Sequence, residues 1–175
     1  MAHPLVLALF QDRTATAAAV HRLRELGIDR ARLSVVCRTH QDEGELAEQI
    51  GATPGAEIED SPAASRLGEL SGLILAAIAL VLPGIGPIVS AGPLAADLGE
   101  AAGHMAGGIA SVLNRAGIPE SQASTWQVRV EHGAVLLGVH ATPIEVEAVR
   151  TALATNGADE IALAEWREGG EERGT

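Results

Sequence analysis

The stretch "HPLVLALFQDRTATAAAVHRLRELGIDRARLSVVC", residues 3–37, predicts a β-α-β unit. Residues 3–10 form an apolar run of the length of a buried strand. Residues 12–27 have the spacing of an amphipathic helix, and Gly27 is a natural helix stop. Residues 32–37 form a second strand. The apolar positions at helical spacing are Ala15, Ala19, Leu23 and Leu26.

A second copy of this pattern lies near the C-terminus. Residues 134–141 predict a strand, residues 142–157 a helix with Thr142 as its N-cap, and residues 160–166 a strand. A shift of 130 residues superimposes the two patterns. The matched pairs are Leu7 with Leu137, Leu9 with Val139, Ala19 with Val149, Leu23 with Leu153, Gly27 with Gly157, Asp29 with Asp159 and Leu33 with Leu163.

Two β-α-β halves that pack on each other predict an α+β fold, a ferredoxin-like split β-α-β sheet with both helices on one face. The sheet domain is expected over residues 1–37 and 134–166. A large insertion separates its second and third strands. The tail, residues 167–175, has the composition of a disordered segment.

The insertion begins with an acidic loop, residues 38–61, and continues as an apolar helical hairpin, residues 62–116. The first helix is expected over residues 62–82, and the second from near Pro93 to about Ala116. Between them, "PGIGPIVSAGP" contains prolines and glycines that no continuous helix crosses. The expected turn residues are Pro83, Gly84, Gly86, Pro87 and Pro93.

Residues 117–133 connect the hairpin to the second half. Trp126, Val128 and Val130 alternate as in a strand, whereas Pro119 and the spacing of Trp126 and Val130 fit a helix. We favour a helix that ends at Gly133.

The hairpin is too short for an ordinary pair of membrane spans. No charge falls between Glu69 and Asp97, but the uncharged part of the first helix has only thirteen residues, 70–82. This is roughly 20 Å of helix, against a hydrocarbon core of about 30 Å. A short hairpin that enters the membrane only shallowly is an alternative interpretation.

Small residues recur at every fourth position of both expected helices and form ridges for close helix packing. In one interpretation the two helices pack only on each other; in the other, the ridges also contact other chains. The first ridge is Ala64, Gly68, Gly72 and Ala76, and the second is Ala95, Gly99, Gly103, Gly107 and Ser111.

Composition narrows the possible partners. The net charge of −11, with twelve arginines as the basic residues, disfavours binding to nucleic acid phosphates. Cys37 is the single cysteine, so the chain has no internal disulfide, and we expect a buried, inert thiol. The start lacks the basic region of a secretory signal, which favours the cytoplasm.

The sequence shows no nucleophile, base and orienting group in a known arrangement, which argues against an enzyme, and it indicates no cofactor. Asp97, Glu100 and His104 share one face of the expected second helix and are a weak candidate metal site. Acidic residues near a helix N-terminus are more often a solvated face.

Several segments resemble a family of bacterial general stress proteins. They are "VLALFQDRTATAAAVHRLRELGI" (6–28), "LPGIGPIVSAGPLAADLGEAAGHMAGGI" (82–109), "LNRAGIPES" (113–121) and "GAVLLGVHA" (133–141). That family has a 17M-like N-terminal domain and is related to low-temperature-induced proteins. The resemblance implies a stress-related protein without catalytic activity, with a Gly/Ala-rich helical hairpin.

These observations favour a structural or interaction protein whose hairpin drives homo-oligomerisation or binds a partner. The first alternative is a membrane-associated protein that inserts the hairpin into the bilayer or a membrane complex. The second is a small-molecule sensor that uses the open sheet face or a subunit interface.

Overall fold

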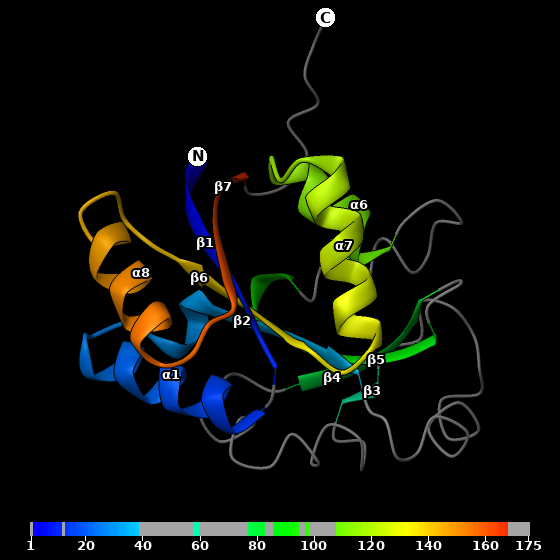
Figure 1. The fold of residues 1–175 in the computed structure, drawn as a ribbon, viewed down its shortest axis with the longest axis horizontal. Helices are drawn as coiled ribbons and strands as arrows, with labels where there is room; N and C mark the ends of the chain where they lie inside the picture. Colours follow the sequence, from blue (N-terminus) through cyan, green and yellow to red (C-terminus); the bar gives the residue numbers. More distant parts are fainter. Residues whose placement is uncertain are drawn as a thin grey trace, which may run out of the picture.

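The protein is α+β and is built on a seven-stranded sheet (Figure 1). The computed structural model describes residues 2–11, 13–38, 58–59, 77–82, 86–94, 97–98 and 108–167. The strands are β1 (Ala2–Phe10), β2 (Leu33–Arg38), β3 (Ile58–Glu59), β4 (Ala77–Leu82), β5 (Gly86–Ala91), β6 (Val135–His140) and β7 (Glu160–Arg167). The helices are α1 (Arg13–Glu25), the 3-10 helix η1 (Arg30–Arg32), α6 (Ile109–Arg115), α7 (Glu120–Glu131) and α8 (Val146–Thr155).

The strand order is β3-β4-β5-β2-β6-β1-β7, and every pair of neighbours is antiparallel. β1 lies between β6 and β7, and β6 also pairs with β2. β1 and β2 are therefore parallel to each other, as are β6 and β7. Each of these parallel pairs is connected through a helix, α1 in the first half and α8 in the second.

Helices cover both faces of the central strands. In Figure 1, α1 and α8 lie side by side, apart from α6 and α7. Successive side chains of β1 alternate between two apolar clusters. Val6, Ala8 and Phe10 pack with residues of α1 and α8, whereas Leu5, Leu7 and Leu9 pack with residues of α6 and α7. Burial on both faces explains why the strand is apolar at successive positions.

The expected first helix of the hairpin is wrong over residues 77–82, which form the strand β4. β4 pairs with β5 from Ala77↔Ala91 to Leu82↔Gly86, so Gly86 and Pro87 belong to a strand and not to a turn. The β-branched residues of β4 and β5 favour strands. β2 offers a sheet edge with which β5 pairs. The insertion therefore extends the sheet. Residues 62–76 and the expected turn residues Pro83 and Gly84 lie outside the described residues.

The expected second helix is not continuous. Pro93, Leu94, Asp97 and Leu98 are helical, but Gly108 has extended backbone (φ −127°, ψ −169°) and precedes α6. Glycine in a helix interior costs up to about 1 kcal/mol, which favours an interruption in a glycine-rich segment. Residues 95–96 and 99–107 lie outside the described residues.

The helix expected over 117–133 is present as α7, with Pro119 at its N-cap and Gly133 just beyond its end at φ 104°. Within the expected acidic loop, Ile58 and Glu59 form the short strand β3. The last strand includes Arg167, one residue of the expected tail. The rest of the tail is outside the described residues.

Candidate functional site

The junction between the insertion and the sheet is closely packed. Gly92 follows β5 with φ 81°, and a Cβ at this position would lie 1.9 Å from the carbonyl oxygen of Leu33. Only glycine fits there, because any side chain would collide with the backbone of β2. Two residues later the backbone N–H of Leu94 donates to the buried Ser34 hydroxyl at 3.1 Å.

Leu94 then covers the middle of the sheet. A Cβ on Gly138 would lie 3.0 Å from Leu94 Cδ1, so the absence of a side chain in β6 makes room for Leu94. Leu94 and Leu98 are both buried in the cluster that contains Leu5, Leu7 and the residues of α6 and α7. The part of the insertion that follows β5 is therefore anchored in the core.

The other part of the insertion forms one edge region of the sheet. β4 has the sequence "AIALVL", which is entirely apolar. On the side of β4 that faces away from β5, two of its six residues have partners among the described residues. Ile78 pairs with Glu59, and Ala79 pairs with Ile58. A strand edge that is left unpaired is a template for pairing with another chain.

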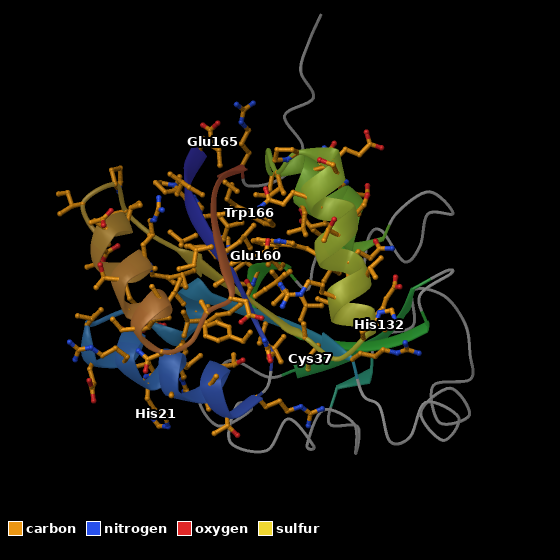
Figure 2. All side chains as sticks on the ribbon, viewed as in Figure 1. His21, Cys37, His132, Glu160, Glu165 and Trp166 are labelled. Carbon is orange, nitrogen blue, oxygen red and sulfur yellow. The ribbon has the colours of Figure 1, made fainter. Side chains whose placement is uncertain are left out.

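A small polar cluster lies at one end of the sheet. His3 Nε2 and His140 Nδ1 are 2.8 Å apart, and the His140 ring packs edge-to-face on Trp166 at 5.1 Å between centroids. We call His3, His140 and Trp166 the sheet-end cluster. Burial and the nearby His3 and Arg32 lower the pKa of His140 to about 4. Figure 2 labels Trp166 next to Glu165 near the end of β7.

Arg32 connects this cluster to the start of α8. Its Nε donates to the backbone carbonyl of His140 at 2.7 Å, and its guanidinium forms a two-pronged pair with Glu145. Glu145 also accepts from the backbone N–H and hydroxyl of Thr142. The Arg32 hydrogen bonds, helped by those from Thr142, hold the pKa of Glu145 at about 2.

A second polar group joins α7 to the start of β7. Trp126 is fully buried, and its Nε1 donates to Glu160 Oε2 at 2.6 Å. Arg129 donates to Glu160 Oε1 at 2.8 Å and also pairs with Asp159. The hydrogen bond to Asp159 is the main reason that the pKa of Arg129 is raised. These contacts position α7 against the start of β7.

The sequence-predicted site residues are mostly outside the described part of the chain. Asp97 is half-buried, but Glu100 and His104 are not described. Where the structure describes the chain, no three His, Cys, Asp or Glu side chains gather as a metal site would need. Ser111 lies half-buried in α6. The undescribed members of the ridges are Ala64, Gly68, Gly72, Ala76, Ala95, Gly99, Gly103 and Gly107.

Cys37 is buried in β2, and desolvation raises the pKa of its thiol to about 11. The thiol is therefore protonated at neutral pH and unreactive as a nucleophile, as the sequence suggests. Sequence reasoning missed the Ser34–Leu94 contact, the close approach at Gly92 and the histidine pair. Each joins residues far apart in the chain, and no local motif marks them.

Comparison with known proteins identifies no relative. No protein-family model matches the chain, and neither the curated proteins nor the solved structures contain a match. Among the described helices, none combines the length and apolar character that a membrane crossing needs.

Proposed function

We propose that the protein is a non-enzymatic structural or interaction protein that binds a second copy of itself through its insertion. The observation that carries this proposal is the incomplete pairing of β4 on its outer side among the described residues. In the described residues, four of the six positions of this apolar strand have no partner on their outer side, since β3 pairs only with Ile78 and Ala79.

Charge favours this edge over the rest of the surface. Two copies that each carry a net charge of −11 repel one another, and the repulsion is smallest where neither presents a charge. β4 lies within residues 70–96, which contain no charged side chain. Antiparallel pairing of residues 80–82, which β3 leaves unpaired, with the same residues of a second copy satisfies two-fold symmetry and supplies hydrogen-bond partners to both copies.

The fold that we propose for the remaining strands is the ferredoxin-like split β-α-β fold. The order β2-β6-β1-β7, two strand-helix-strand units and the placement of α1 and α8 in one cluster support it. In this proposal the insertion between β2 and β6 continues the same sheet at its β2 edge. A cytoplasmic, stress-related role is part of the proposal and rests on the sequence resemblance.

Light scattering on the full-length chain tests the proposed assembly. Leu80→Lys and Val81→Lys add a charge to β4 at neighbouring positions, which face opposite sides of a strand. We expect the wild type to have a molar mass of at least twice 18.0 kDa. In both variants the dissociation constant of the assembly should rise at least about tenfold, which favours the monomer.

Val128→Lys is the matched control, because Val128 is an exposed apolar residue of α7, away from β4. It should keep the wild-type mass. Equal masses for all four proteins would contradict the proposed edge. Aggregation of the wild type that mild detergent alone relieves would instead favour insertion of the apolar segment into a membrane.

A further inference from the structure

The sheet-end cluster contains a buried histidine whose hydrogen bonding is incomplete. His140 is 6% exposed, and its buried Nε2 atom has no hydrogen-bond partner among the described residues. Its other ring nitrogen is engaged with His3. Buried polar atoms usually have a partner, so an unpaired ring nitrogen calls for a functional explanation.

The cluster joins three strands at the point where β1 begins. His3 lies in β1, His140 is the last residue of β6, and Trp166 is the penultimate residue of β7. In the β1–β7 register, His3 lies opposite Trp166. The neighbouring backbone contact, from Ala141 N–H to the Pro4 carbonyl at 2.9 Å, holds the same end of β1 against β6.

The hydrogen bond between the two rings needs one proton between two nitrogens. It forms when one ring donates and the other accepts, and it is lost when both nitrogens carry a proton. A first added proton places a charge in a buried site, and a second removes the hydrogen bond. The hydrogen bond therefore holds only while at least one of these two nitrogens is unprotonated.

The charges around His140 disfavour its protonation. Arg32, the last residue of η1, donates to the His140 carbonyl and adds a positive charge, which Glu145 at the start of α8 partly balances. On the β7 side, Glu165 pairs with Arg167, and both are exposed. Among the described residues, no carboxylate forms a hydrogen bond or an ion pair with the His140 ring, so none stabilises a charged His140 directly.

We propose that the sheet-end cluster is an acid-sensitive latch, in which the neutral histidines hold the start of β1 against β6 and β7. A second proton on the histidine pair breaks its hydrogen bond, releases residues 2–4 and exposes the Trp166 ring. The lowered pKa of His140, about 4, places the release in the acidic range, below the ordinary value of 6.5.

The release also affects the helical layer. The backbone N–H of Glu165, next to Trp166, donates to the Ala116 carbonyl at the end of α6 at 3.0 Å. Ala116 and Trp166 belong to the same apolar cluster. Movement of Trp166 therefore loosens the contact between β7 and α6, so that an acidic environment acts on the layer that follows the insertion.

The test is acrylamide quenching of tryptophan fluorescence in the full chain, from neutral pH to about pH 3.5, below the pKa of His140. The wild type should show a reversible rise of at least about twofold in quenching as pH falls, while far-UV circular dichroism changes little. His140→Gln keeps polar atoms but removes the titration, and should abolish the rise. Trp166→Phe should also abolish it, because Trp126 stays buried.

His21→Gln is the matched control, since His21 is an exposed histidine of α1, and it should behave as the wild type. A rise that persists in His140→Gln, a wild type without any rise, or a rise that coincides with loss of circular dichroism would each overturn the latch.

NMR titration of the histidine rings in the wild type keeps the proposal testable if His140→Gln does not fold. We expect one ring in the chain to titrate well below the ordinary histidine pKa of 6.5. If all six histidines titrate near the ordinary value, the latch is overturned.

Discussion

At the scale of single residues, backbone geometry at Gly92 decides how the insertion leaves the sheet. The residue has φ 81° and lies directly on the backbone of β2. Two separate penalties therefore act on any substitution there, the left-handed conformation and the collision with Leu33. Gly27 provides the comparison, because its φ is 87° and nothing lies within 4 Å of a Cβ at that position.

Gly92→Ala should be far more destabilising than Gly27→Ala. The conformational penalty alone is about 1 kcal/mol, so Gly27→Ala should lower the free energy of unfolding by about that amount. Gly92→Ala should lower it by at least about 3 kcal/mol, because the backbone of β2 must move. Urea unfolding of both variants gives the comparison, and equal losses would contradict the close approach at Gly92.

At the scale of secondary-structure elements, α7 is fixed to β7 through Glu160. This carboxylate accepts from both Trp126 and Arg129, two residues of the same helix that lie three positions apart. Trp126 brings its indole N–H into a fully buried position, where an unsatisfied donor is destabilising. Glu160 therefore serves as a joint between the helix and the strand.

Glu160→Ala should lower the free energy of unfolding by about 2 kcal/mol, since it leaves the Trp126 N–H and the Arg129 guanidinium without this partner. Glu160→Gln keeps an acceptor for Trp126 and should lose about half as much. Glu165→Ala is the control, because Glu165 is an exposed residue of the same strand, and it should change stability by less than about 0.5 kcal/mol. Urea unfolding followed by tryptophan fluorescence measures all three, and equal losses for Glu160→Ala and Glu165→Ala would refute the joint.

The sequence predicts an element well when local spacing and burial agree. The strand β1 follows from the continuous apolar run within residues 3–10, and the helix α1 follows from the spacing of apolar residues within 12–27. The prediction is wrong for residues 77–82, because a short uncharged apolar run has no periodicity that distinguishes a buried helix from a strand. Pairing with β5, which itself binds β2, decides the outcome, and that information lies outside the segment.

In the candidate sites, the environment of some residues follows from the local sequence, and that of others depends on strand pairing. The burial of Cys37 follows from its place in an apolar strand. The His3–His140 pair follows only from the register, in which β1 lies between β6 and β7 and brings the start of one strand to the end of another. The register depends on how three distant strands pair, which neither histidine's local sequence indicates.

At the scale of the whole molecule, the sheet has two edges of different character. On the β7 side, Glu165 N–H donates to the Ala116 carbonyl, so the loop after α6 covers part of that edge. Covered edges resist pairing with other chains. On the other side, β3 contributes two residues and β4 is uncharged. This asymmetry supports our proposal that two copies of this acidic protein meet at the β3–β4 end of the sheet.

The most direct measurement is hydrogen–deuterium exchange of backbone amides as a function of protein concentration. If a second copy binds at the edge, amides of β4, residues 77–82, exchange at least about tenfold more slowly in concentrated than in dilute protein. Amides of β1, which is paired on both sides within one chain, serve as the reference and should not change. Exchange in β4 that is identical at every concentration, in a protein that light scattering shows to be monomeric, would contradict the account.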